Sequence, residues 1–321
     1  MPSIVHDNGL TMSVVRVAVA VICNDQGEVL IQQRAADTHQ GGLWEFPGGK
    51  VEAGETLETA LQREIREELN IEVITSRPLI TVSHDYGDRH VSLEVYRVTE
   101  WQGQASSMEQ QPLLWVMPER LHDYPMPAAD RPIVSAIKLP SSYIITPAVI
   151  DKPSLIIDQL QTLLDAGERM FLYRVKTLVG QTHEAMQQEI FTLCNRRKAL
   201  LLVHEKNRST VQAHGTHLTE AGLNQHEKKS EVDGLLSVSC HSAQALKKAE
   251  AMNADFAMLS PVAKTQSHPG TKPLGWQNFK AIVDNANIPV YALGGMTAEH
   301  KEQAWLHGAQ GVAGISSWWQ L

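Results

Sequence analysis

The sequence predicts an α/β protein with two domains, the second of which is a closed (β/α)₈ barrel of the TIM type. The length of 321 residues corresponds to about two domains. A short polar segment with a proline, residues 138–142, interrupts the pattern. After it, apolar β-rich runs alternate with helical patterns, which is typical of α/β folds. We expect a first domain over residues 1–137, a linker over 138–142 and a barrel domain over 143–321.

The composition is that of an ordinary globular protein, with 43% hydrophobic and 20% charged residues. The net charge of −8 at pH 7 argues against tight binding to nucleic acid polymers, because such binding needs a basic face. A single nucleotide is compatible with this charge, because metal ions can bridge its phosphates to carboxylates. The sequence does not fix the oligomeric state.

The cysteines favour a reducing compartment. Cys23, Cys194 and Cys240 lie far apart and show neither a zinc-binding nor a disulfide spacing. No apolar run approaches about 18 residues, the length that a membrane span needs. The first residues lack the basic start and apolar core of a signal peptide. We expect a cytoplasmic protein that does not bind membranes.

In the first domain, apolar β-rich runs bounded by turn residues predict strands, and an apolar period of 3.6 residues predicts helices. The turn at 24–27 indicates a hairpin between the first two strands. The expected strands cover 14–23, 28–33, 79–84, 90–98 and 113–116, and the expected helices cover 57–70 and 131–137.

The first expected helix carries three crowded acids. Glu64, Glu67 and Glu68 have the spacing i, i+3, i+4, which places all three carboxylates on one side of a helix. Like charges at this spacing repel each other, and a hard divalent cation would relieve the repulsion. The alternative is an ordinary acidic amphipathic helix.

The flanking residues favour a binding site. Pro47-Gly48-Gly49 allows a tight turn that brings bare backbone close to a ligand, and Thr56 is placed as the N-cap of the helix. The pattern G-x5-E-x7-R-E-U-x-E-E, with U an aliphatic residue, resembles the Nudix box. Asn70 stands where the family usually has Gly. This helix end needs a left-handed backbone, which Asn tolerates.

Further segments extend the resemblance to residues 14–137 and to the MutT branch of the Nudix family: WEFPGGK, GDRH and the ADRP turn. The resemblance implies an α/β/α sandwich with a mixed sheet. It also implies hydrolysis of nucleoside triphosphates to monophosphate and pyrophosphate, with a preference for oxidised guanine nucleotides. Carried over by position, the implied ligands of Mg²⁺ or Mn²⁺ are Gly48 (through its carbonyl), Glu64, Glu67, Glu68 and Glu109. The implied substrate contacts are Arg34, Arg89 and, beside the base, Phe46.

The chemistry explains these residue types. The negative charge of a triphosphate repels an attacking water, divalent ions offset that charge, and a carboxylate then takes the proton. Glu64 and Glu109 are both candidates for this base. Arg63 is expected to pair with nearby box acids and fix them. Arginine at positions 34 and 89 suits a bidentate phosphate clamp. A strand end, a turn and simple core packing are the alternatives for Arg34, Arg89 and Phe46.

Asp130 departs from the MutT pattern, which usually has Asn there. Asn can donate and accept, and so can read N7–H and O6 of 8-oxoguanine. An ionised Asp only accepts, and would repel O6 unless burial protonated it. The hypothesis is that the chain still prefers 8-oxo-dGTP over dGTP, by a margin that changes with pH.

In the second domain, the apolar β-rich runs predict a barrel, and a doubly wound sheet is the alternative. Barrel sites lie at the carboxyl ends of strands. The expected strands cover 143–146, 170–175, 199–204, 215–218, 235–241, 256–261, 289–295 and 311–316.

The segments YRVK, GTHL, SVSCHS and ALGGM resemble the thiamine phosphate synthase and TenI superfamily. The implied barrel site comprises Arg174, Lys176, His241, Thr265, Gly295 and Ser316, with a phosphorylated ligand. Two departures put synthase activity in doubt: His204-Glu205 replaces an Asn-Asp pair, and residues 219–222 lack the metal-binding acid at its expected place. His241 matches the histidine of TenI-type tautomerases, whereas His217 is expected to be merely hydrogen-bonded.

Two functions follow. The favoured one is a metal-dependent pyrophosphohydrolase that converts 8-oxo-dGTP to 8-oxo-dGMP and pyrophosphate, with a degenerate phosphate-binding barrel. The alternative is a thiamine-pathway protein that hydrolyses a thiamine-related pyrophosphate, with a tautomerase- or synthase-like barrel.

Overall fold

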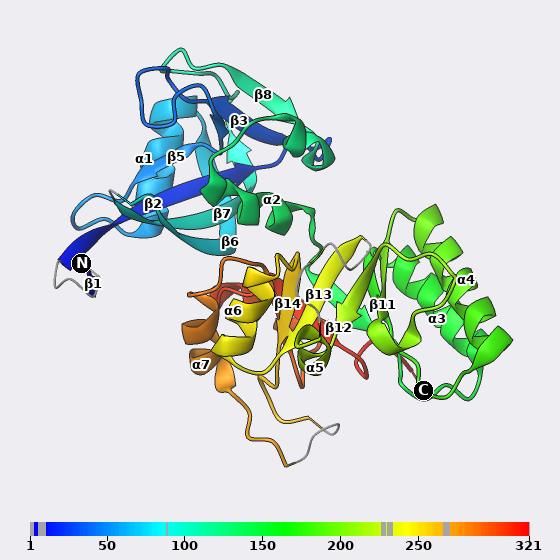
Figure 1. Cartoon of the computed structure of the whole chain (residues 1–321). Helices are drawn as coiled ribbons and strands as arrows, with labels where there is room; N and C mark the ends of the chain where they lie inside the picture. The colour runs from blue at the N-terminus through cyan, green and yellow to red at the C-terminus, as the bar shows by residue number, and fades with distance from the viewer. Residues whose placement is uncertain are drawn as a thin grey trace. The chain divides into compact units, whose positions relative to one another are not determined.

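A computed structural model gives the fold. It describes residues 3–5, 11–87, 89–225, 229, 234–265 and 270–320. The chain divides into two compact units, Met1–Leu139 and Pro140–Leu321 (Figure 1). The expected linker, 138–142, contains the last residue of one helix and the first residue of one strand.

The first unit is built on a mixed sheet. Its strands follow the order β1-β2-β7-β6, and β5 also pairs with β2. β2 and β7 run parallel, whereas the other pairs are antiparallel. These strands are β1 (Ser3–Val5), β2 (Thr11–Ile22), β5 (Gly48–Lys50), β6 (Glu72–Asp85) and β7 (His90–Gln102). A second, antiparallel sheet has the order β4-β3-β8, with β3 (Val29–Gln33), β4 (Trp44–Glu45) and β8 (Leu113–Val116).

Two helices cover the mixed sheet. Because side chains alternate along β2, Ala18 and Ala20 pack with the buried face of α1 (Leu57–Leu69), while Val19 and Val21 join the core that includes α2 (Arg131–Lys138). This arrangement confirms the predicted α/β/α sandwich.

The predicted hairpin is wrong in one respect. Residues 14–23 and 28–33 do form strands around the turn at 24–27, but these strands belong to different sheets. In the described part of the chain they meet in a single bridge between Cys23 and Val29. The turn residues were read correctly, whereas the divergence beyond them depends on tertiary packing.

Both ends of α1 follow the sequence prediction. The Thr56 hydroxyl accepts a hydrogen bond from the backbone N–H of Thr59 at 3.2 Å, and so caps the first turn. Asn70 ends the helix in the left-handed conformation, with φ of 54°. The box helix is therefore held at both ends by local residues.

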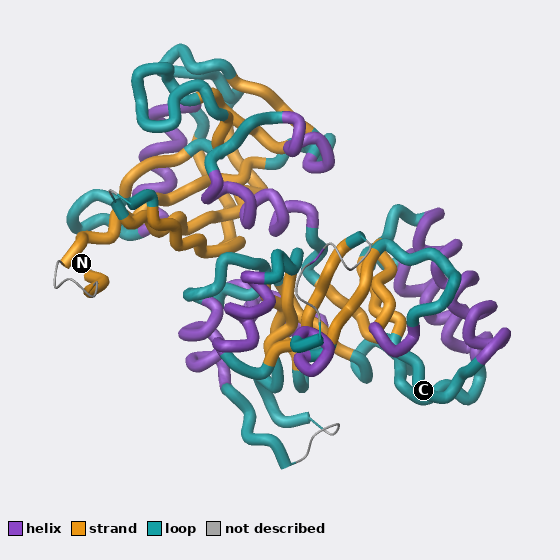
Figure 2. Tube along the Cα trace, viewed as in Figure 1, coloured by secondary structure: helices purple, strands orange, loops and turns teal. Residues whose placement is uncertain are grey.

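The second unit is a closed parallel barrel with the strand order β10-β11-β12-β13-β14-β15-β16-β9, so a doubly wound sheet is excluded. Helices surround the strands (Figure 2). The strands are β9 (Ser142–Ile145), β10 (Met170–Tyr173), β11 (Leu200–His204), β12 (Gly215–Leu218), β13 (Leu235–Cys240), β14 (Phe256–Leu259), β15 (Val290–Leu293) and β16 (Gly311–Gly314). The helices are α3 (Pro153–Asp165), α4 (Gly180–Arg196), α5 (Glu220–Leu223), α6 (Ala243–Ala251), α7 (Gly275–Val283) and α8 (Lys301–Leu306).

Aromatic side chains fill the middle of the barrel. Tyr143, Phe256 and Tyr291 are fully buried and pack against one another, with ring centroids 5.3 to 5.9 Å apart. They leave the carboxyl ends of the strands for polar residues. None of the helices in the described ranges is long and apolar enough to cross a membrane.

Candidate functional sites

The acidic face of α1 lies against the glycine turn. The Glu68 carboxylate accepts hydrogen bonds from the backbone N–H of Gly48, at 3.0 Å, and from the side-chain amide of Gln32, at 3.1 Å. A side chain at Gly49 would collide with the Glu64 carboxylate. Two of the three box acids, Glu64 and Glu68, therefore lie beside Gly48 and Gly49.

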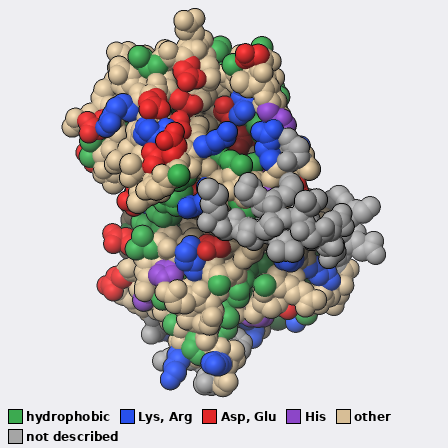
Figure 3. All heavy atoms as spheres, turned by 90° about the vertical axis from the view of Figure 1, so that its left-hand side faces the viewer, with side chains coloured by type: hydrophobic (Ala, Val, Ile, Leu, Met, Phe, Trp, Pro, Cys, Tyr) green, Lys and Arg blue, Asp and Glu red, His purple; other side chains and the backbone are tan. Residues whose placement is uncertain are grey.

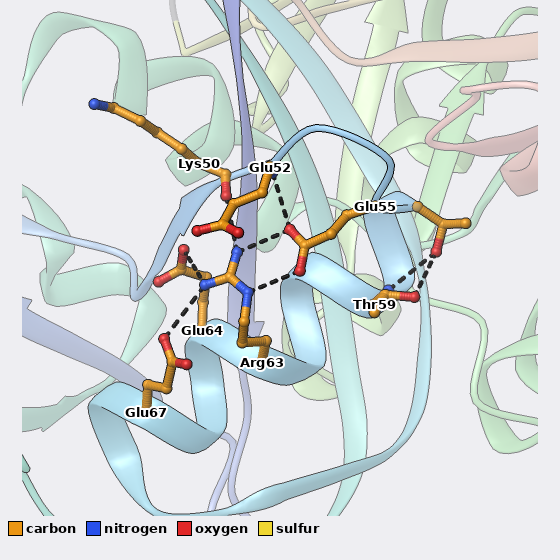
Figure 4. A network of polar contacts seen from close by, with 8 residues as sticks. Lys50, Glu52, Glu55, Thr59, Arg63, Glu64 and Glu67 are labelled. Atoms are coloured by element: carbon orange, nitrogen blue, oxygen red, sulfur yellow. Dashed lines mark hydrogen bonds and ion pairs between the residues drawn. The ribbon is translucent and has the colours of Figure 1, made fainter.

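Arg63 links the acids to one another (Figure 4). Its guanidinium donates to both carboxylate oxygens of Glu55 at 2.8 and 2.9 Å. It also donates to Glu64 at 2.8 Å and, more weakly, to Glu67 at 3.3 Å. The hydrogen bonds that Glu55 accepts from Arg63, followed by the one it accepts from the backbone N–H of Glu52, lower the pKa of Glu55 to about 2. Glu67 is the most exposed of the three box acids, since 60% of its side-chain surface is accessible.

The electrostatics of Glu68 provide a test of whether a cation fits. Burial raises the pKa of Glu68 to about 7, and the neighbouring charges of Glu45 and Glu64 add to the shift, although the bonds from Gly48 and Gln32 oppose it. Negative charge is thus in excess around a buried carboxylate, and a bound cation would relieve it. In the protein-only arrangement, no three Asp, Glu, His or Cys side chains of the described ranges are gathered closely enough to hold a metal. Arg63 holds two of the candidate ligands instead.

Glu109 lies outside this contact network. It is exposed, and its carboxylate accepts from the side chain of Gln111 at 3.2 Å. Its loop is nevertheless tied to α1, because the backbone N–H of Met108 donates to the carbonyl of Glu68 at 2.9 Å. Glu109 remains a predicted ligand that the structure does not bring into contact with the box acids.

A second cluster surrounds Tyr86 at the end of β6. Asp130, at the end of the short helix η2 (Ala128–Asp130), is 6% exposed, and its Oδ2 has no hydrogen-bond partner among the described residues. Burial raises the pKa of Asp130 to about 8; Glu45 adds to the shift and Arg34 opposes it. Arg34 forms a salt bridge with Glu45. The Asp130 charge in turn contributes to the raised pKa of Tyr86, which is mainly due to burial.

The two remaining substrate predictions have different surroundings. Phe46 is 4% exposed and belongs to the core that packs on α2, which is the packing role named as its alternative. Arg89 is exposed in the β6–β7 turn, where its carbonyl accepts from the N–H of Tyr86. Asp88 of the GDRH segment lies outside the described residues.

The predicted barrel residues follow strands at the carboxyl end of the barrel. Arg174 and Lys176 follow β10, and His241 follows β13. His241 is exposed, and its Nδ1 lies 2.9 Å from the carbonyl oxygen of Ser260. Gly295 follows β15 and has a φ of 71°; a side chain there would crowd the carbonyl of Lys264. Thr265 and Ser316 lie in the loops after β14 and β16.

Several residues in these sites were missed by sequence reasoning. Glu45 lies within the WEFPGGK segment and Tyr86 directly precedes GDRH, but the sequence analysis assigned a role to neither side chain. In the barrel, His217 is hydrogen-bonded through both ring nitrogens, to Ser237 at 2.6 Å and to Ser239 at 2.8 Å, which agrees with its predicted role. The involvement of both serines was not foreseen, because it depends on the register of β12 and β13.

The surface of the first unit agrees with the charge pattern of its site. The face shown in Figure 3 carries acidic side chains gathered together, with basic side chains among them. Such a mixed surface can meet phosphates through arginines and metal ions through carboxylates. The fold and this site define an enzyme of the phosphoanhydride-hydrolysing class, followed by a barrel of the TIM type.

Comparison with known proteins identifies both units. Residues 18–136 match the family described as NUDIX domain, and residues 142–318 match the family described as Thiamine monophosphate synthase. The chain is 49% identical over 88 residues to the 8-oxo-dGTP diphosphatase of Proteus vulgaris, covering 27% of this chain and 79% of that protein. It is 38% identical over 125 residues to the CTP pyrophosphohydrolase of Escherichia coli K12, covering 39% of this chain and 92% of that protein. It is 37% identical over 163 residues to an Aquifex aeolicus protein provisionally named thiamine-phosphate synthase 2, covering 50% of this chain and 88% of that protein.

The chain therefore belongs to the Nudix hydrolases through its first unit and to the thiamine monophosphate synthase family through its second. Hydrolases of the first family generally need a divalent metal ion.

Proposed function

We propose that the first unit is a Mg²⁺-dependent pyrophosphohydrolase that converts 8-oxo-dGTP to 8-oxo-dGMP and pyrophosphate. The observation that carries this proposal is the placement of Glu64 and Glu68 against Gly48 and Gly49, with Arg63 fixing Glu64 from the other side. The relatives named above, which include two nucleotide-hydrolysing proteins, support the same class of substrate.

The residues have distinct tasks in this proposal. Glu64, Glu67, Glu68 and the Gly48 carbonyl would hold the ion, which offsets phosphate charge and acidifies a bound water. Arg63 orients Glu64 and Glu55 through charge-assisted hydrogen bonds. Glu109 would add a ligand or take the proton once its loop meets the substrate. Glu64 is the other candidate base, so both remain to be tested.

Asp130 provides the basis for recognising oxidised guanine. A buried carboxyl with a raised pKa is neutral at pH 7, so it both donates and accepts a hydrogen bond. Its O–H can donate to O6 of 8-oxoguanine while its C=O accepts from N7–H. Unmodified guanine presents two acceptors on this edge and forms only one of these bonds. Arg34 and Arg89 would contact the phosphates, and Phe46 would support the base from the core.

The decisive experiment is a substrate comparison. The full chain is incubated with Mg²⁺ and 8-oxo-dGTP, dGTP, CTP or hydroxymethylpyrimidine diphosphate, and pyrophosphate or phosphate release is measured. The proposal requires the highest kcat/KM for 8-oxo-dGTP and no turnover in EDTA. A higher kcat/KM for another substrate would overturn the assignment of this nucleotide.

One observation favours the alternative function. The second unit belongs to the thiamine monophosphate synthase family, so a thiamine-related pyrophosphate is a chemically reasonable substrate for its fused partner. Preferential hydrolysis of the hydroxymethylpyrimidine diphosphate would support this reading.

A further inference from the structure

Gln32 is a buried glutamine of the first unit that belongs to none of the motifs. It lies on β3 and is 3% exposed. Its partner across the antiparallel β3–β4 pair is Glu45, so the two side chains lie next to each other on one face of that sheet. Because a buried amide is costly unless it is hydrogen-bonded, the groups that Gln32 binds indicate its task.

One partner of Gln32 is a predicted cation ligand. Nε2 of Gln32 donates to Oε2 of Glu68 at 3.1 Å, and the backbone N–H of Gly48 donates to the same oxygen at 3.0 Å. The other oxygen, Oε1, receives no hydrogen bond from any residue that the structure describes. Two donors on one oxygen fix the carboxylate and leave its second oxygen for a cation.

The other partner is the carboxylate of Glu45. Burial raises the pKa of Glu45, whereas the charge of Arg34 and the hydrogen bonds from Arg34 and Gln32 oppose this rise. One amide nitrogen has two N–H groups, so Gln32 can donate to Glu45 and Glu68 at once. Gln32 therefore joins a carboxylate of the cation site to a carboxylate outside it.

Glu45 connects this amide to the residues proposed to bind the nucleotide. It forms a salt bridge with Arg34, and Nε of Arg34 also donates to the carbonyl of His39 at 2.9 Å. Burial and, after it, the charge of Glu45 raise the pKa of Asp130. A shift of the Glu45 carboxylate would therefore change the surroundings of both Arg34 and Asp130.

A neutral donor suits the position between Glu45 and Glu68 better than a cation. The charge of Glu45 adds to the raised pKa of Glu68, which is mainly due to burial, and the hydrogen bond from Gln32 opposes this rise. Gln32 thus offsets part of the repulsion between the two carboxylates. A lysine or arginine at this position would also offset it, but its charge would compete with a metal ion for Glu68.

We propose that Gln32 is a positioning residue of the hydrolase, whose single amide holds Glu68 for the cation and Glu45 for Arg34. This inference rests on the proposed function of the first unit. It implies that one side chain outside the set of cation ligands and nucleotide contacts supports both ends of the substrate site.

Two probes, applied separately to the full chain, test this proposal. Binding of Mn²⁺ without nucleotide is followed by electron paramagnetic resonance, and binding of 8-oxo-dGMP in EDTA is followed by calorimetry. Gln32→Met keeps the length of the side chain and removes both donors. It should weaken Mn²⁺ binding by ~10- to 100-fold, the range for partners of metal ligands. It should weaken 8-oxo-dGMP binding by roughly 2- to 10-fold, the equivalent of one hydrogen bond.

A double-mutant cycle distinguishes positioning through Glu45 from a general structural role. If Gln32 acts on the nucleotide through Glu45, Gln32→Met combined with Glu45→Gln should weaken 8-oxo-dGMP binding no more than the stronger single variant does. Additive losses would overturn the proposal. Thermal unfolding in EDTA verifies that each variant is folded at the temperature of the titrations.

Gln187→Met is the control. Gln187 is 1% exposed on α4 of the second unit, and its amide donates to the carbonyl of Val211 at 3.2 Å. This variant also loses a buried amide, and it should keep both affinities. If Gln32→Met does not fold, Gln32→Asn replaces it, because an amide one methylene shorter cannot serve both carboxylates, and the same two losses are expected.

Two results would count against these assignments in different ways. Unchanged affinity of the Gln32 variant for either probe, in a parent that binds both, would overturn the role of Gln32 alone. A parent that does not bind 8-oxo-dGMP would overturn the proposed function, and this inference with it.

Discussion

The carboxylate of Glu68 accepts a hydrogen bond from the backbone N–H of Gly48 over 3.0 Å, and this bond joins the acidic helix to the glycine turn. Because Glu68 is more buried than Glu67, the turn rather than solvent supplies its partner. The position of the acids is therefore set by the absence of side chains at 48 and 49. This dependence on bare backbone can be tested directly.

Gly49→Ala should impair catalysis more than folding. The new methyl group would meet the Glu64 carboxylate and displace it, and a misplacement of about 1 Å can cost roughly 100-fold in rate. The measurement is kcat/KM for 8-oxo-dGTP with Mg²⁺. Gly270→Ala, at an open position of the second unit, is the control and should retain full activity. Equal activity of the two variants would contradict the proposed geometry.

Glu67→Gln should remove most activity while the fold remains intact. The change deletes a charge without altering shape, and Glu67 is exposed enough to tolerate it. A loss on the order of 10- to 100-fold or more is expected, since even outer-shell partners of a metal matter this much. Glu58→Gln, an exposed acid in the first turn of α1, serves as the control. Normal turnover of the Glu67 variant would mean that this face of the helix is not catalytic.

Arg63→Lys should not retain the activity of the parent protein. Lysine keeps the charge, but its ammonium group cannot reproduce the two bonds to Glu55 together with the bond to Glu64. We expect a loss of about 10- to 100-fold in kcat/KM, the range for residues that orient metal ligands. If Arg63 acted only through its charge, the lysine variant would be nearly as active as the parent.

Local sequence was sufficient for the box and insufficient for its surroundings. The spacing of Glu64, Glu67 and Glu68, the Thr56 cap and the Asn70 helix end all depend on neighbours within a few residues, and each is where the sequence placed it. The electrostatic interactions of Asp130 with Arg34 and Glu45 join residues about ninety positions apart. No periodicity encodes such a contact.

The barrel shows the same limit. Eight strand runs were readable because each is a short apolar segment bounded by turns. The hydrogen-bond partners of Glu205 and His217 could not be predicted from the sequence, because these partners depend on which strands are neighbours and on the register of those strands. The resemblance predicted that residues 219–222 lack a metal-binding acid, but not that the Thr219 hydroxyl would donate to the Glu205 carboxylate.

The stability of the protein in EDTA should depend on the ionisation of Asp130. Its folded pKa is raised from 3.8 to about 8, so the fold favours the neutral form. The free energy that the neutral Asp130 carboxyl contributes to folding is fully present below pH 3.8. It is lost as pH rises towards 8, by at most about 1.4 kcal/mol per pH unit. Urea unfolding at pH 5 and pH 8 measures it. Asp130→Asn does not titrate, so its free energy of unfolding should fall less over this range, whereas parallel losses would contradict the assignment.

The same ionisation should appear in catalysis. Above about pH 8 the Asp130 carboxyl loses its O–H and repels O6 of 8-oxoguanine, so kcat/KM for 8-oxo-dGTP should decline. Burial of the carboxyl mainly sets the pH at which the decline begins, while the charge of Glu45 raises the pKa of Asp130 further and that of Arg34 lowers it. Asp130→Asn donates and accepts at every pH, and should keep the preference over dGTP while losing this decline. Asp123→Asn, an exposed surface change, should follow the parent profile. Profiles from pH 6 to about 9.5 for the three proteins decide the matter, because a decline that persists in Asp130→Asn must come from another group.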